Sequence, residues 1–249
     1  MSLRVTDPAA SESVVPEPPA EVYPGAPLQA VAMEVYFRGL LDALPRLAAW
    51  QRAHAASYEQ LVVPVDEEAA NPLRPVILIS TQEKRGVAVA VNQLTTIAYD
   101  YAGGYQAFAA WGVPCLLEGL QLLEVHQATR MAFRYENVVS LPSGQLEIEQ
   151  FFRILLPRPE PVGGNTGSLA LAWRYPWAKG EVAVDLAIAP HPDDSKARAL
   201  LLTIVADRQR ALAVGELEKG IDEVHRLARW TFERLITDEF RERLRKGTT

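Results

Sequence analysis

The stretch His126-Gln-Ala-Thr-Arg-Met-Ala-Phe-Arg-Tyr-Glu-Asn-Val-Val139 alternates two kinds of side chain. Successive side chains of an extended strand point to opposite faces, so the stretch has two distinct surfaces. The apolar surface carries Thr129, Met131, Phe133, Tyr135 and Val139. The other surface carries Ala128, Arg130, Ala132, Arg134 and Glu136. We therefore predict the central strand of a sheet, with its apolar side turned toward a core.

The residues before this strand predict a mixture of strands and helices. Apolar and aromatic residues predict a first strand at 26–38, and leucines at helical spacing predict a helix at about 40–58. Polar turns separate three strands between residues 76 and 101. Residues 105–124 have apolar and aromatic side chains three, four and seven apart, which predicts a helix packed on the sheet.

The residues after the central strand predict three more strands and a final helix. Alternation predicts strands at 169–177 and 182–188, and residues 199–205 are apolar on both faces. We expect this third strand to be central and covered on both sides. A long helix is predicted from about Val214, and Thr237 is expected to cap a terminal turn.

Proline-rich segments divide the chain. Residues 1–24 are acidic, rich in proline and poor in large apolar side chains, which predicts a disordered tail. Alternating prolines and a Gly-Gly-Asn sequence follow residue 156 and predict a boundary between lobes at 25–156 and 157–249. The predicted fold class is α+β, with antiparallel sheets packed by helices, a long C-terminal helix and two lobes that a weak duplication relates.

Composition excludes several classes of function. The chain of 249 residues has a formal net charge of -6, which argues against binding nucleic acid or anionic lipid over its whole surface. No window approaches the roughly 18 consecutive apolar residues of a spanning helix, and no signal peptide pattern is present. The single cysteine, Cys115, cannot form an internal disulfide, so we expect a soluble protein of the cytoplasm.

Motifs for catalysis or for metal and cofactor binding are missing from the sequence. It contains no phosphate-binding glycine loop and no GxSxG elbow. The four histidines occur singly, and the cluster His191-Pro-Asp-Asp194 is what a polar turn between strands also predicts. We therefore assign no catalytic residue, metal or cofactor.

Arg130, Arg134, Glu136 and the adjacent Asn137 are the candidate ligand-binding residues. If helices cover the face that carries the first three, the desolvated charges need partners and can line a pocket for an anionic ligand. If that face meets water, they form a cross-strand charge ladder that contributes little to stability. Arginines near the C-terminus are a further candidate, for nucleic acid, but glutamates lie among them.

Four stretches together resemble a family described as sporadically distributed conserved hypothetical proteins of bacteria and archaea. They are Ala26-Pro-Leu-Gln-Ala-Val-Ala-Met-Glu-Val-Tyr-Phe37, Val91-Asn-Gln-Leu-Thr95 with the helix after it, Arg134-Tyr-Glu-Asn137 and Phe232-Glu-Arg-Leu-Ile-Thr237. The resemblance implies an α+β fold and marks Arg134, Tyr135 and Asn137 as a signature strand. It implies no activity and no catalytic residues.

The leading functional hypothesis is a non-enzymatic binding or protein-interaction module, because a sheet packed by helices offers a groove while catalytic motifs are missing. The partner is expected to be a protein or a small ligand, and a homo-oligomer is compatible with the sequence. The alternatives are an enzyme whose site assembles from distant residues around Arg134 and Glu136, and a nucleic-acid-associated protein that uses its C-terminal helix.

Overall fold

The computed structural model describes residues 17–18, 22–63, 75–99, 101, 103–141, 148–153, 169–191 and 194–247. The strands of its main sheet are β1 (Leu28–Tyr36), β2 (Gln60–Val62), β3 (Val76–Ser80), β4 (Arg85–Ala90), β5 (Gln93–Tyr99), β7 (Arg130–Ser140), β8 (Ala170–Trp177), β9 (Gly180–His191) and β10 (Asp194–Arg208). The helices are α1 (Ala43–Ala53), α2 (Gly104–Leu122), α3 (Leu217–Leu235) and α4 (Asp238–Lys246). The short β6 (Gln127–Ala128) and β11 (Leu212–Ala213) pair separately, and η2 (Ile148–Gln150) and η3 (Val214–Glu216) are 3-10 turns.

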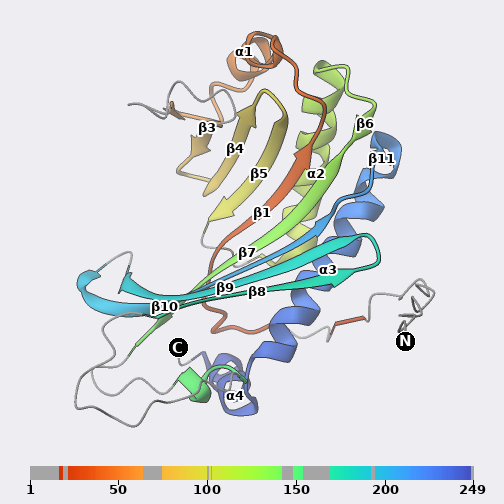
Figure 1. Ribbon diagram of the computed structural model, residues 1–249. Coiled ribbons are helices and arrows are strands. Elements are labelled where there is room, and N and C mark those ends of the chain that lie inside the picture. The colour runs from red at the N-terminus through yellow and green to blue at the C-terminus, as the bar shows by residue number, and fades with distance from the viewer. Residues whose placement is uncertain are drawn as a thin grey trace, which may run out of the picture.

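The described strands of the main sheet are antiparallel and follow the order β2-β3-β4-β5-β1-β7-β10-β9-β8 (Figure 1). The α+β class, the antiparallel sheet packed by helices and the C-terminal helix are therefore confirmed. None of the described helices is long and apolar enough to cross a lipid bilayer.

The sheet contains the same order of strands twice. In the first group, β1 pairs with β5, followed by β4 and β3, and the chain continues into α2. In the second group, β7 pairs with β10, followed by β9 and β8, and the chain continues into α3. Pairing of β1 with β7 joins the groups, so one sheet runs through both predicted lobes. The repeated order divides the chain between α2 and β7, whereas the predicted boundary at residue 157 lies outside the described residues.

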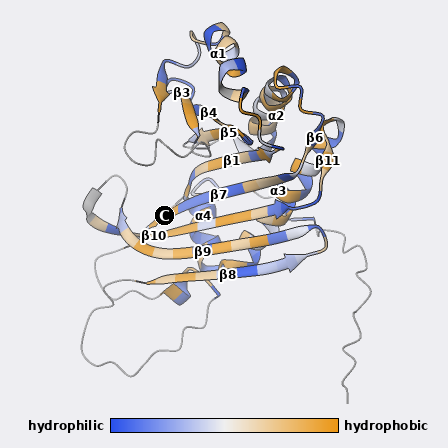
Figure 2. Ribbon diagram, turned by 45° about the horizontal axis from the view of Figure 1, so that its top comes forward, coloured by the Kyte–Doolittle hydropathy of each residue, from blue (hydrophilic) through white to orange (hydrophobic). Residues whose placement is uncertain are grey.

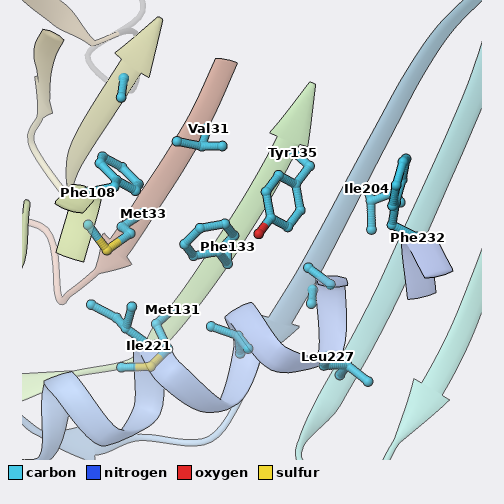
Figure 3. Packing of buried hydrophobic residues seen from close by; sticks show 14 of the residues in the cluster. Val31, Met33, Phe108, Met131, Phe133, Tyr135, Ile204, Ile221, Leu227 and Phe232 are labelled. Atoms are coloured by element: carbon cyan, nitrogen blue, oxygen red, sulfur yellow. The ribbon is translucent and has the colours of Figure 1, made fainter. Parts of the chain in front are cut away.

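The core lies between the sheet and helices α2 and α3, which pack on the same face of it (Figure 1), and Figure 3 shows part of its packing against α3. The alternation predicted for the central strand is confirmed within β7, where Met131, Phe133 and Tyr135 all point into this core (Figure 3). It is wrong before β7, because the chain bends between β6 and β7, so that Ala128 is buried in the core and Thr129 is exposed. A glycine lets each helix approach a methionine of the sheet. A Cβ atom on Gly112 of α2 would meet Met33, and one on Gly220 of α3 would meet Met131.

The opposite face of the sheet has no described helix in front of it (Figure 2). The expectation that the strand at 199–205 is covered on both sides is therefore wrong. Leu201 and Val205 of β10 point to this helix-free face and are half-buried, because neighbouring strands of the twisted sheet shield them in part. At the end of α3 the predicted cap is confirmed, since the Thr237 hydroxyl accepts a hydrogen bond from the Phe240 N–H of α4.

Candidate functional site

The polar residues predicted on β7 lie on the helix-free face. The side chains of Arg130 and Arg134 are 40% and 36% exposed, so the sheet shields each guanidinium group only in part. Asn137 points the other way and is buried on the helix-covered side, where its Nδ2 donates to the Leu202 carbonyl at 3.2 Å. The structure therefore brings together Arg130, Arg134 and Glu136 and separates Asn137 from them.

Arg134 pairs with a carboxylate that the sheet buries. Glu34 of β1 is 2% exposed, and its Oε1 accepts a hydrogen bond from Arg134 Nη2. Its Oε2 accepts another from the Tyr36 hydroxyl at 2.6 Å, while Arg134 Nη1 donates to Glu136 Oε1 at 3.3 Å. Both oxygens of the buried carboxylate thus have donors, as a charge removed from water requires.

Arg130 makes an equivalent pair on the other side of β7. Its Nε and Nη2 lie 2.9 and 2.8 Å from Oδ2 of Asp207 in β10, which is 5% exposed. The other carboxylate oxygen, Oδ1, accepts a hydrogen bond from the Glu181 N–H at 2.9 Å. The Arg130 guanidinium also lies 4.8 Å from the centre of the Tyr36 ring, a cation–π contact that links the two pairs.

The register of the three central strands explains this arrangement. Ala132 of β7 lies opposite Glu34 of β1 and opposite Asp207 of β10. Arg130 and Arg134 are the next residues on the same face of β7, on either side of Ala132. The two arginines and two carboxylates therefore surround one small side chain, and we call these four charged residues with Ala132 the central cross.

Farther along the same face, a shallow hollow of about 360 Å³ lies over β8, β9 and β10. Its lining includes the small side chains Ala170, Ala172 and Ala187 together with Asp185 and Thr203. Thr203 lies opposite both Asp185 and Glu136, and Glu136 contacts Arg134, so the hollow lies next to the central cross. This part of the helix-free face is therefore an open, shallow surface rather than an enclosed pocket.

A second polar cluster, which sequence reasoning missed, lies at the margin of the core between the helices and β7, where Tyr101, Tyr105 and His225 are each partly buried. The His225 ring of α3 stacks on Tyr105 of α2 at 3.5 Å between ring centroids, and it meets the edge of Phe133. Its Nδ1 atom is buried without a hydrogen-bond partner among the described residues, as is the hydroxyl of Tyr101. Burial, together with the charges of Arg229 and Arg226, lowers the pKa of His225 to about 3, so the imidazole is neutral in the folded protein.

This aromatic cluster has the features of packing rather than of a site. Burial raises the pKa values of Tyr101, Tyr105 and Tyr135 well above the usual value for tyrosine, which keeps all three phenols protonated. The rings of Tyr105, Phe133 and Tyr135 pack against His225, as aromatic side chains at a core margin commonly do. The only sequence signal for it was a single histidine on the apolar face of the last long helix.

The arginines near the C-terminus are engaged with acidic side chains. Arg241 contacts Glu233 and Asp238, while Arg243 and Arg245 contact Glu239 and Glu242. These pairs reduce the positive charge that this end of the protein presents to a phosphate backbone. Comparison of the chain with models of known protein families and with curated proteins found no match.

Proposed function

We propose that the protein is a non-catalytic interaction module that binds a partner protein on the helix-free face of its sheet. The observation that supports this most directly is the central cross. Two carboxylates are buried on a face that no described helix covers, and each is held by an arginine whose side chain stays partly exposed, 40% for Arg130 and 36% for Arg134. A preformed set of charges of this kind orients a partner without having to be ordered on binding.

The shape of the face favours a protein over a small molecule. Small-molecule sites are concave and enclose most of their ligand, whereas the hollow over β8 to β10 is shallow. Around it the face combines alanines with half-buried aliphatic side chains such as Leu201 and Val205, and Ile97 of β5 adds another farther across the sheet. Such a surface suits an extended or helical segment laid across several strands.

The charges of the face favour a basic partner segment. The carboxylates on its described part are Glu34, Glu136, Glu181, Asp185 and Asp207, and the arginines are Arg130, Arg134 and Arg174. Carboxylates exceed arginines, and the whole chain has a net charge of -6. A segment rich in lysine or arginine therefore matches this face in charge, and its binding should weaken as salt rises.

The test compares two substitutions of the same kind on opposite sides of the molecule. Val205→Arg places a long cation on the helix-free face beside Arg134, whereas Leu122→Arg changes an exposed leucine of α2. We expect some proteins to be captured by the wild type and by Leu122→Arg but not by Val205→Arg. These proteins are purified, and their affinity for the wild-type chain is measured at 50 and 300 mM salt. We expect weaker binding at the higher salt.

Two results would refute the proposal. One is an identical set of captured proteins for all three chains. The other is turnover of a compound in a panel of hydrolase and transferase substrates that Arg134→Ala abolishes while circular dichroism shows an intact fold. That second result would support an enzyme with its site around Arg134 and Glu136.

A further inference from the structure

We infer that two copies of the chain pair through the outer edges of their β8 strands and form one continuous sheet. β8 is the last strand at its end of the sheet, and within the described residues only β9 pairs with it (Figures 1 and 2). This inference goes beyond the proposed function, because the pairing uses main-chain groups at the edge rather than the central cross, and it shares with that function only Arg174 and the hollow over β8 to β10.

The hydrogen-bond pattern shows which main-chain groups point outward. The Ile188 N–H donates to the Leu169 carbonyl at 2.9 Å, so alternate residues from Leu169 onward bond to β9. The residues between them, Ala170, Ala172 and Arg174, therefore direct their N–H and C=O groups away from the sheet. Pro176 also faces outward, where its missing N–H costs no bond to β9.

The two ends of the sheet differ in how they are protected against pairing. At the opposite end, β2 has three residues and offers too short a ladder for a stable partner strand. β8 has eight residues, with Arg174 as its one charged side chain, and the exposed side chain of Tyr175 next to it. A long, mostly uncharged edge is the kind that accepts another strand.

A two-fold axis through Ala172 gives each outward N–H group a carbonyl. In this antiparallel register Ala172 pairs with Ala172 of the second copy, and Ala170 pairs with Arg174 in both directions. Pro176 lies beyond this ladder and limits its length. On the helix side of the sheet, Tyr175 of one copy comes opposite Leu169 of the other, which covers a ring that is 46% exposed in the single chain.

On the helix-free side, the same register places the charged side chain of one copy against the hollow of the other. Arg174 of one copy lies opposite Ala170 of the other, at the hollow that Asp185 lines. The small alanines of this hollow leave room for the long arginine. In the single chain Arg174 pairs with Asp185 of its own copy at 2.9 Å, and in the dimer Asp185 of each copy exchanges this partner for Arg174 of the other. Each copy carries both the arginine and the hollow at this edge. The two-fold axis therefore produces the contact between Arg174 and the hollow twice in the dimer.

The first experiment measures the mass of the purified full-length chain by sedimentation equilibrium. We expect twice the chain mass of 27.5 kDa for the wild type. Ala172→Pro removes one outward N–H from each copy without affecting the ladder to β9, and should sediment as the single chain. Ala172→Thr keeps that N–H and should remain a dimer. A monomeric wild type, or a dimer that Ala172→Pro leaves intact, would overturn the inference.

A cross-linking experiment tests the register without a proline. Residues in a hydrogen-bonded antiparallel pair have Cα atoms about 5.5 Å apart, within the range of a disulfide, so Ala172→Cys should form a covalent dimer under mild oxidation. The two copies of Ala170 are separated by roughly 13 Å of strand, so Ala170→Cys should not. Burial raises the pKa of the native Cys115 to about 12, which keeps that thiol from competing. Equal cross-linking at both positions, or at neither, would contradict the proposed pairing.

Discussion

Glu34 and Asp207 lie on opposite sides of Ala132, one on each of the two strands that pair with β7. Both carboxylates are buried, and the arginines that neutralise them flank Ala132 on its own strand. The methyl group of alanine leaves space for all four charged side chains to meet over the centre of the sheet. The stability of this centre therefore depends on charge pairing as well as on packing.

Removal of Arg134 should destabilise the fold. Arg134→Ala leaves the Glu34 carboxylate buried with the Tyr36 hydroxyl as its remaining described donor, and we expect a loss of about 1–3 kcal/mol in the free energy of unfolding. Urea denaturation measures this loss. Adding Glu34→Gln to the same chain should restore part of it, since no buried charge is then left unpaired. Simple additivity of the two losses would show that the residues do not interact.

A larger side chain at the centre should also be costly. Ala132→Leu inserts atoms between Glu34 and Asp207, and overpacking of this kind costs about 1–3 kcal/mol. Ala183→Leu, on the same face in β9 but only half-buried, is the matched control and should change the unfolding midpoint much less. Equal effects of the two substitutions would mean that space around Ala132 is not restricted.

Truncation of a side chain on the helix-covered face of β7 should destabilise the fold as a core substitution does. Phe133 has no exposed surface and contacts Tyr105, Phe108 and His225, so Phe133→Ala should lower the free energy of unfolding by about 3–5 kcal/mol. The measurement is chemical denaturation followed by tryptophan fluorescence. A loss below roughly 1 kcal/mol would contradict the burial of this ring.

His225 should make the stability depend on pH. Its pKa is about 3 in the folded protein and close to 6.5 when unfolded, so the unfolded chain binds the additional proton between these values. The destabilisation from this group begins as pH falls below about 6.5 and grows by up to about 1.4 kcal/mol per pH unit until about pH 3. His225→Phe removes the titrating group.

The pH effect is measured as the difference in unfolding free energy between wild type and His225→Phe at pH 7.5 and pH 5. We expect the variant to lose less stability on acidification than the wild type does. Parallel pH profiles for the two proteins would show that the imidazole is accessible to protons in the folded state.

The sequence was sufficient to predict which face of β7 carries each side chain, but not which residues pair with its charged side chains. Alternation with a period of two places Arg130, Arg134 and Glu136 on one side whatever the rest of the fold is. Glu34 lies 100 residues from Arg134 and Asp207 lies 77 residues from Arg130, and only the strand order brings them together. No local pattern contains that order.

The error at β10 has a physical reason. An apolar run such as 199–205 is typical of a strand buried on both faces, and the expectation of helices on each side followed from it. In the structure, only the side with Leu200, Leu202 and Ile204 is fully buried, whereas Leu201 and Val205 are shielded by neighbouring strands. Hydrophobicity alone does not distinguish a covering helix from a curved sheet.

The pairing of β1 with β7 determines when the main sheet can be completed during synthesis of the chain. β1, β3, β4, β5 and α2 emerge from the ribosome before β7 is synthesised. The edge of β1 that later pairs with β7 is therefore unpaired at that stage. The partner strand β7 is synthesised about a hundred residues later. Until then, β1 can pair wrongly with β7 of another nascent chain, because the two β7 strands are identical. A chaperone that shields β1 until β7 arrives would therefore raise the yield of correctly joined molecules.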